Sequence, residues 1–161
     1  ICHSFGSCIT SNNTGILFQN RGVNFRLEEN HPNSIQGNKR PLHTIIPGLV
    51  TNFNDESVLS YGVMGGQYQP IGQSHVLQNI FDYNQDVQQA LDFPRAFALN
   101  GELKVEKSLN PYVVEKLINV GHKVLTVDNA IGGGQCIKID RANGVLIGGS
   151  DPRKDGMAIG Y

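Results

Sequence analysis

The sequence predicts an α+β fold in a single domain, residues 1–161, with largely antiparallel sheets and helices stacked outside them. Two observations support this class. Strand candidates outnumber helix candidates along the chain, and several strand candidates are joined by tight turns, as in antiparallel hairpins. A chain of 161 residues is also long enough to bury one sizeable core.

The first 64 residues contain three strand candidates separated by polar segments. Residues 15–20 form a short apolar run after a turn-forming segment, and the polar stretch 26–39 is predicted to be a long loop. Residues 43–50 carry β-branched side chains at successive positions, which is typical of a strand buried on both faces. A polar turn then leads into residues 58–64, so the last two strands are expected to form a hairpin.

Three helices are predicted in the middle of the chain. Residues 74–83 place apolar side chains at the i, i+1, i+4 and i+5 spacing of an amphipathic helix. Residues 86–91 continue as a short helix that Pro94 stops. A third helix begins at Asn110, an N-cap residue followed by proline, and ends at Gly121.

Four further strand candidates complete the pattern. Residues 102–106 form one strand before the third helix, and residues 123–127 form another after it. Residues 135–139 and 144–149 are separated by an Arg-Ala-Asn-Gly turn, which predicts a tight hairpin. These strands, with the hairpin before them, lead to the prediction of largely antiparallel sheets.

Composition excludes several classes of partner. The chain has 39% hydrophobic and 17% charged residues and a net charge of −1. This near-neutral balance provides no electrostatic basis for binding nucleic acid or an anionic membrane surface. No apolar run approaches the roughly 18 residues that a membrane-spanning helix needs. The five histidines show no metal-ligand spacing, so we expect neither a metal nor another cofactor.

The chain has three cysteines, an odd number without CxxC spacing: Cys2, Cys8 and Cys136. This argues against a disulfide framework and favours a reducing compartment, the cytoplasm. Cys136 lies in an apolar strand and is expected to be a small buried hydrophobe. Cys2 and His3 are neighbours, and neighbours on a strand point to opposite faces, so no Cys–His catalytic pair is expected. Because the chain starts at Ile1 without a signal-peptide pattern, we expect it to be a piece of a longer polypeptide.

Two adjacent glycines, Gly65 and Gly66, follow the predicted strand 58–64 and precede a helix. Glycine allows positive φ and close approach of a ligand to the backbone. The pair has neither the lysine of a phosphate-binding Walker motif nor the GxGxxG spacing. It fits an oxyanion hole made of two consecutive N–H groups, and it fits equally well a tight turn with no chemical role. Composition and spacing leave these alternatives open.

Four stretches in order and spacing resemble the small, C-terminal subunit of the γ-glutamyltranspeptidases and their relatives, including the glutaryl-cephalosporin acylase-like branch. They are FGSCITSNNTGILFQNRGVNF (5–25), NKRPLHTIIPGLV (38–50), GVMGGQYQP (62–70) and GGSDPRKDGMAIGY (148–161). The resemblance covers essentially the whole chain. Its last motif is expected to be a terminal turn held by Asp151 and Arg153, each pairing with other segments.

The resemblance implies an N-terminal nucleophile (Ntn) hydrolase, a four-layer αββα sandwich. It implies that a precursor cleaves itself and exposes a threonine, whose hydroxyl attacks an amide with its own α-amino group as the base. The acyl group then passes to water or to an amino acid acceptor, as in a γ-glutamyltransferase or glutathione hydrolase. Gly65 and Gly66 correspond to the oxyanion-hole glycines. The nucleophile is expected outside this chain, so the chain alone is expected to be inactive.

The resemblance also places substrate-binding positions, and here the chain departs from the family pattern. The carboxylate-binding Ser-Ser pair falls on His43 and Thr44. The acidic residues that hold the substrate's α-amino group fall on Arg21 and Asn24, and the family's first-strand asparagine falls on Cys2. A guanidinium repels an ammonium group, so we expect a pocket that prefers an acyl group with a free carboxylate, bound by Arg21.

Several readings stay open beside this one. Arg21 could instead form an ion pair with the large, N-terminal subunit, which the resemblance implies as the partner from the same precursor. The whole protein could be a glutaryl-type acylase of the same fold, or a homologue without catalytic activity. The implied substrate is a small γ-glutamyl or related amide, and a homodimer of heterodimers is a further expectation.

Overall fold

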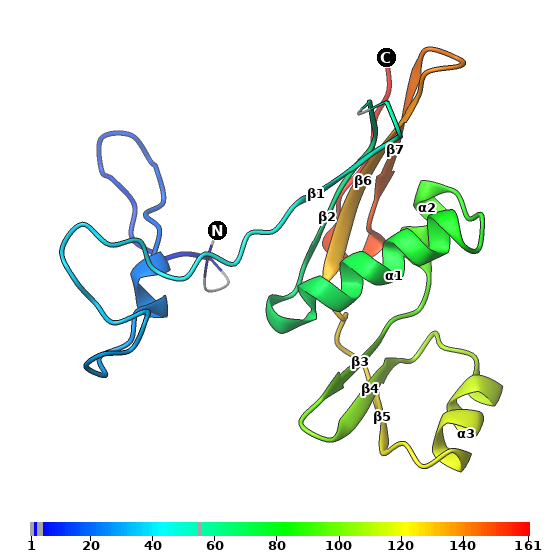
Figure 1. The fold of residues 1–161 in the computed structure, drawn as a ribbon, viewed down its shortest axis with the longest axis horizontal. Coiled ribbons are helices and arrows are strands. Elements are labelled where there is room, and N and C mark those ends of the chain that lie inside the picture. Colours follow the sequence, from blue (N-terminus) through cyan, green and yellow to red (C-terminus); the bar gives the residue numbers. More distant parts are fainter. Residues whose placement is uncertain (1, 3–4, 55) are drawn as a thin grey trace. The chain divides into compact units, whose positions relative to one another are not determined.

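The computed structural model describes residues 2, 5–54 and 56–161 (Figure 1). Internal contacts divide the chain into two units, Ile1–Ile45 and Ile46–Tyr161. His3, named above in the discounted Cys–His pair, lies outside the described residues. No helix in the described part of the chain has the length and apolar character needed to cross a membrane.

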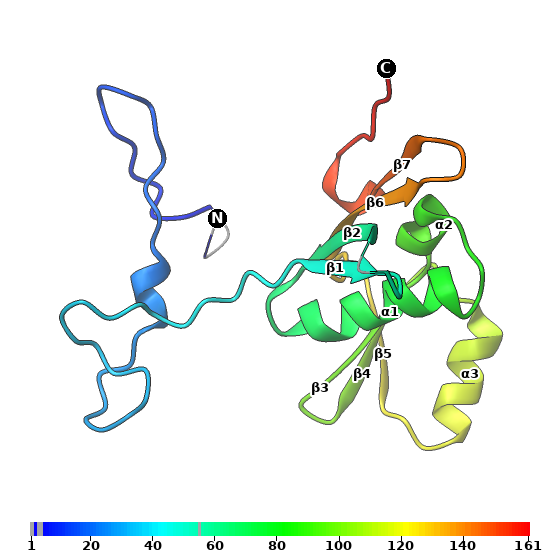
Figure 2. The same ribbon diagram turned by 45° about the horizontal axis from the view of Figure 1, so that its top comes forward.

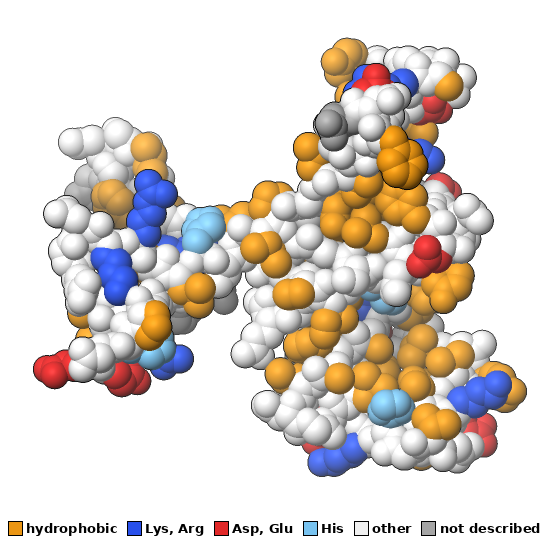
Figure 3. Space-filling model, viewed as in Figure 1, with side chains coloured by type: hydrophobic (Ala, Val, Ile, Leu, Met, Phe, Trp, Pro, Cys, Tyr) orange, Lys and Arg blue, Asp and Glu red, His pale blue; other side chains and the backbone are white. Residues whose placement is uncertain are grey.

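The unit Ile1–Ile45 contains little regular structure. It has one short 3-10 helix, η1 (Arg21–Asn24), and isolated bridges that join Thr10 to Leu17 and Arg26 to Ser34. The predicted loop 26–39 is observed, but the prediction of a strand at residues 15–20 was wrong. Ile16 and Phe18 in that run are exposed, and hydrophobic side chains are visible on this unit's surface in Figure 3. An apolar run does not become a strand without a surface to bury it.

The unit Ile46–Tyr161 is built on a four-stranded antiparallel sheet (Figure 2). Its strands, in the order β1-β2-β6-β7, are β1 (Gly48–Thr51), β2 (Ser57–Met64), β6 (Gly133–Asp140) and β7 (Val145–Ser150). Both predicted hairpins, β1–β2 and β6–β7, are confirmed. The central pair sets Tyr61 opposite Cys136 and Met64 opposite Gly133. The end of β2 therefore lies beside the start of β6.

The predicted strand 43–50 is shorter than expected and is not buried on both faces. Regular pairing starts only at Gly48, and Ile45, Ile46 and Leu49 are exposed. β1 is the edge strand of its sheet. The β-branched residues favour extended backbone, but their burial depends on what packs over them, which the pattern does not record.

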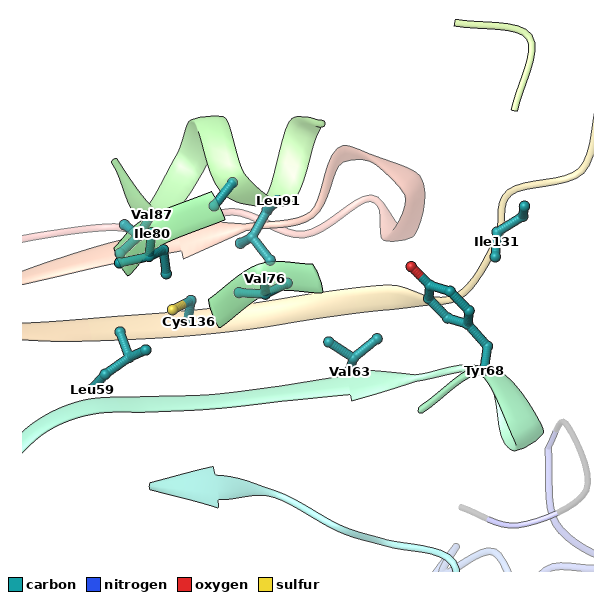
Figure 4. Close-up of a cluster of buried hydrophobic side chains, with 10 residues drawn as sticks. Leu59, Val63, Tyr68, Val76, Ile80, Val87, Leu91, Ile131 and Cys136 are labelled. Carbon is teal, nitrogen blue, oxygen red and sulfur yellow. The ribbon is translucent and has the colours of Figure 1, made fainter. Parts of the chain in front are cut away.

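Two helices cover one face of this sheet, α1 (Gln69–Phe81) and α2 (Val87–Asp92). α1 begins five residues before the predicted start, with Pro70 in its first turn. Asp86 and Gln89 form a capping box that starts α2. The core between helices and sheet is apolar and includes Leu59, Val63, Val76, Ile80, Val87, Leu91 and Cys136 (Figure 4). Cys136 is buried, as predicted, and this burial raises the pKa of its thiol to about 11.

A second, three-stranded sheet has the order β3-β4-β5, with β3 (Ala96–Leu99), β4 (Glu102–Glu106) and β5 (Val124–Val127). β3 was not predicted, although the Asn100-Gly101 turn with two positive φ values, 53° and 79°, is a strong hairpin signal. β5 pairs with β4 in parallel after a crossover through α3 (Pro111–Asn119). The α+β class with mostly antiparallel pairing is confirmed, with this one parallel pair as an exception.

Candidate active site

The two adjacent glycines form the turn between β2 and α1. β2 ends at Met64, and Gly65 and Gly66 follow with φ values of 137° and 61°. Both glycines are exposed, and neither N–H donates a hydrogen bond to another described residue. A Cβ at Gly66 would meet no atom within 4 Å. The turn therefore presents two consecutive backbone donors that are exposed and have no partner among the described residues.

A third glycine, Gly132, packs against the backbone of this turn. A Cβ on Gly65 would lie 3.0 Å from the Cα of Gly132. Gly132 has a φ of 69°, and a Cβ there would lie 2.5 Å from the carbonyl oxygen of Met64 and 2.6 Å from Cδ1 of Tyr68. The backbone segments touch because neither carries a side chain. Gly132 was not among the predicted site residues, although a run of three glycines before Gln135 is typical of a close backbone approach.

Four charged side chains form a cluster beside this region: the buried Arg95, Glu106 and Asp151 and the partly buried Arg153. Arg95 Nη2 lies 2.5 Å from Asp151 Oδ2, with both side chains at most 1% exposed. Arg153 donates to Glu106 Oε1 and Oε2 at 2.7 and 2.6 Å and to Asp151 Oδ1 at 3.2 Å. The predicted pairing of Asp151 and Arg153 with other segments is confirmed. Their partners Arg95 and Glu106 were missed, because a lone charge in a sequence does not indicate burial.

The cluster keeps Glu106 ionised. Burial by itself raises the pKa of this carboxyl group, but the hydrogen bond from Arg153 and the N–H groups of Ile131 and Arg95 outweigh burial and hold the pKa below its usual value. Glu102 on the same strand is paired with Lys123 instead. Glu102 therefore makes its ion pair outside the buried cluster.

The substrate-binding candidates lie in the unit Ile1–Ile45, and the structure brings two of them, Arg21 and Thr44, into direct contact. Arg21 Nη1 donates to Thr44 Oγ1 at 2.6 Å. Asn24 Nδ2 donates to the carbonyl oxygen of Leu42 at 2.9 Å, next to the exposed His43. Nε and Nη2 of Arg21 donate to no other described residue, which leaves one edge of the guanidinium available.

Cys2, the remaining candidate, is hydrogen-bonded to a residue that lies close to Arg21 in the sequence. Its backbone N–H donates to Oε1 of Gln19 at 3.3 Å, two residues before Arg21. Its thiol is not in a disulfide. Among the described residues, no three His, Cys, Asp or Glu side chains gather in a way that would hold a metal ion.

A titratable group next to the buried cluster makes stability depend on pH. His75 on α1 is partly buried, and its Nε2 has no hydrogen-bond partner among the described residues. Burial, with smaller contributions from Arg95 and Arg153, lowers the pKa of His75 below 6.5. The folded state therefore binds this proton less readily than the unfolded state.

We expect the resulting stability to be fully present above about pH 6.5 and to decline as the pH falls below it toward the folded-state pKa. His75→Phe keeps a ring next to Phe93, 5.7 Å away between ring centroids, and removes the titration. Urea unfolding of the full-length protein at several pH values should show a shallower acid decline for this variant. The same slope in both proteins would contradict the assignment to His75.

Comparison with known proteins agrees with the predicted fold and family. The family model for γ-glutamyltranspeptidase matches residues 1–161. A glutathione hydrolase-like proenzyme of Bacillus subtilis is 40% identical over 97% of this chain and 31% of its own length. An oxamate amidohydrolase proenzyme of Klebsiella pneumoniae is 33% identical over 100% of this chain and 32% of its own length. The chain thus spans about a third of the length of these relatives.

Solved structures show the same fold. The cephalosporin acylase from Bacillus halodurans is 41% identical with a TM-score of 0.83, covering 97% of this chain and 30% of that one. An acivicin-inhibited γ-glutamyltranspeptidase is 28% identical with a TM-score of 0.80, covering 96% of this chain and 89% of that one. The chain belongs to the γ-glutamyltranspeptidase family and has its Ntn-hydrolase fold. The resemblance predicted from four sequence stretches is confirmed.

Proposed function

We propose that this chain is the C-terminal, small-subunit part of an Ntn amidohydrolase that acts as a γ-glutamyltransferase or glutathione hydrolase-like enzyme. The Gly65–Gly66 turn is the observation that carries the proposal. It presents two adjacent N–H groups that are exposed and bonded to no described residue. Such a pair is suited to a developing oxyanion, and loss of one donor from an oxyanion hole typically costs about 2.7–4 kcal/mol of barrier.

The chemistry follows from this turn and from a threonine supplied from outside the 161 residues. The threonine hydroxyl attacks the amide carbonyl carbon, and its proton passes to the threonine's own α-amino group. The carbonyl oxygen becomes an oxyanion that accepts hydrogen bonds from Gly65 and Gly66. Collapse breaks the C–N bond, the leaving amine takes the proton, and water or an amino acid then attacks the ester.

The partner in this proposal is the large, N-terminal subunit cut from the same precursor. Two observations support it. The relatives above are proenzymes roughly three times as long as this chain. The unit Ile1–Ile45 exposes large apolar side chains, including Phe5, Ile9, Ile16 and Phe18, and an exposed apolar surface of this kind is typical of an interface.

The substrate in this proposal carries a free carboxylate on its acyl group. Arg21 has an unused guanidinium edge, and its bond to Thr44 holds it in place. A carboxylate that approaches this edge forms two charge-assisted hydrogen bonds. This feature also favours the second candidate function, a glutaryl-type acylase, and a similar solved structure is named as a cephalosporin acylase.

Arg21→Ala in the full-length, self-cleaved protein tests the substrate class. We expect kcat/KM for glutaryl p-nitroanilide to fall about 10- to 100-fold, mainly through KM, because hydrogen bonds to a charged group are worth about 1.5–3 kcal/mol. Arg26→Ala is the matched control, since that side chain is exposed in the same unit. A γ-glutamyl preference that survives Arg21→Ala would refute the carboxylate role. A precursor that neither cleaves itself nor hydrolyses either anilide would instead indicate a non-catalytic homologue.

A further inference from the structure

We infer that Arg95 and Glu106 are positioning residues that hold the Gly65–Gly66 turn in place through the main chain of Ile131, an inference that rests on the proposed role of the turn. Neither side chain touches the turn with a polar atom, and neither was a candidate for the site. Their effect is transmitted through one peptide segment and one aromatic ring.

The first step is a pair of hydrogen bonds that fix the backbone of Ile131, here called the grip on Ile131. Its N–H donates to Glu106 Oε1 at 3.0 Å, and its carbonyl oxygen accepts from Arg95 Nη1 at 2.9 Å. Arg95 and Glu106 are 1% and 7% exposed, so solvent does not compete with these bonds. A residue whose donor and acceptor are both bound to buried ions has little freedom to move.

The second step leads from Ile131 to the turn. Gly132 follows directly, and its Cα is the nearest atom to a Cβ built on Gly65, at 3.0 Å. Its own Cβ position is 2.5 Å from the carbonyl oxygen of Met64. Gly133 pairs with Met64 across the sheet. Since these backbones are in contact, a displacement of Ile131 moves the surface on which Gly65 rests.

Tyr68 provides a parallel connection. Its ring is buried and lies beneath the guanidinium of Arg95, with 5.9 Å from Cζ to the ring centroid. Carbon atoms of the same side chain approach the Cβ positions of Gly65 and Gly132 to 3.3 and 2.6 Å. Arg95 thus supports both sides of the contact between the two glycines.

The grip is rigid because Arg95 and Glu106 are themselves anchored to the end of β7. Asp151 accepts hydrogen bonds from Arg95 and, at 2.8 Å, from the N–H of Gly134. Arg153 donates a hydrogen bond to Glu106. An oxyanion hole needs its donors about 2.7–3.1 Å from the oxygen. A displacement of about 1 Å can cost about 100-fold in rate.

Two conservative variants test the inference in the full-length protein. Arg95→Lys keeps the positive charge but replaces the planar guanidinium, which bonds Ile131 through Nη1 and Asp151 through Nη2, with a single nitrogen that lacks this fixed geometry. Glu106→Gln keeps the shape and loses the charge. For each, kcat for γ-glutamyl p-nitroanilide, normalised to the cleaved chain, should fall about 10- to 100-fold while KM changes less than about twofold. Amide hydrogen exchange in the peptide that covers residues 64–68 should accelerate.

Val87→Ala is the matched control. Val87 is 2% exposed in the core under α2, so its truncation destabilises the fold without altering the grip on Ile131. It should leave kcat and the exchange of residues 64–68 unchanged. If Arg95→Lys does not yield soluble protein, the milder Glu106→Gln decides the question.

The outcomes separate this inference from the proposed function. Unchanged exchange, or an unchanged kcat with accelerated exchange, would overturn the positioning role. A loss of kcat/KM that comes only from a change in KM, with kcat unchanged, would also overturn it. If the wild-type protein hydrolyses no amide but hydrogen exchange of residues 64–68 accelerates in both variants, the proposed function is refuted. The structural role of Arg95 and Glu106 in holding the turn is then still supported.

Discussion

Gly132→Ala should lower kcat for amide hydrolysis by at least about 100-fold, the effect expected when an oxyanion donor is misplaced. The new Cβ would lie 2.5 Å from the carbonyl oxygen of Met64 and 2.6 Å from Tyr68, and both contacts are too short to persist. Met64 immediately precedes Gly65. Relief of the clash must therefore move the turn or the ring that supports it.

Gly144→Ala is a close control for this experiment. Gly144 has a φ of 67°, almost the same as the 69° of Gly132, but an added Cβ meets nothing within 4 Å. Both variants carry the same backbone strain, about 1–2 kcal/mol, and only one disturbs the turn. Thermal unfolding should show a stability loss in both cleaved proteins, larger for Gly132→Ala because of its clash, and steady-state kinetics should show a large rate loss only for Gly132→Ala. Equal rates in both variants would contradict the role of Gly132.

Asp151→Asn should destabilise the fold by about 3–5 kcal/mol, the cost typical of breaking a buried ion pair. Asp151 is 0% exposed and accepts hydrogen bonds from Arg95, Arg153 and the Gly134 N–H. The isosteric amide removes the negative charge and leaves the guanidinium of Arg95 buried without its counter-ion. Chemical denaturation of the full-length protein measures the change in unfolding free energy.

Lys107→Ala is the comparison. Lys107 pairs with Asp128 on the surface, where the two side chains are 70% and 75% exposed. Solvent-exposed pairs are typically worth about 0–1 kcal/mol, so this variant should be nearly neutral. Comparable losses in the two variants would show that burial does not set the strength of the Asp151 interactions.

Local signals in the sequence correctly located much of the fold. Asn110 followed by proline predicts the start of α3, and the Asn110 side chain indeed accepts from the Tyr112 N–H. Residues 58–64 and 102–106 carry strand patterns and are strands. These signals succeed because caps, turns and apolar periodicity act within a few residues along the chain.

The failures share a physical reason. Residues 15–20 and 43–47 have strand-like composition, but no segment that the structure describes buries them, and β3 was missed because its pattern is short and partly exposed. Arg95 and Glu106 gave no local signal at all. Their burial depends on Asp151 and Arg153, which are about 50 residues away along the chain.

The sequence by itself determined the family and the position of the paired glycines, and it supplied the residues that we propose as substrate-binding, because each of these follows from order and residue type. Only the tertiary structure decided that the two amides bond no described residue, that Gly132 packs against the turn, and that three buried charges and the partly buried Arg153 hold the adjoining segment. The reason is that hydrogen-bond partners and burial are set by segments far apart in the chain, whose meeting a linear pattern does not record.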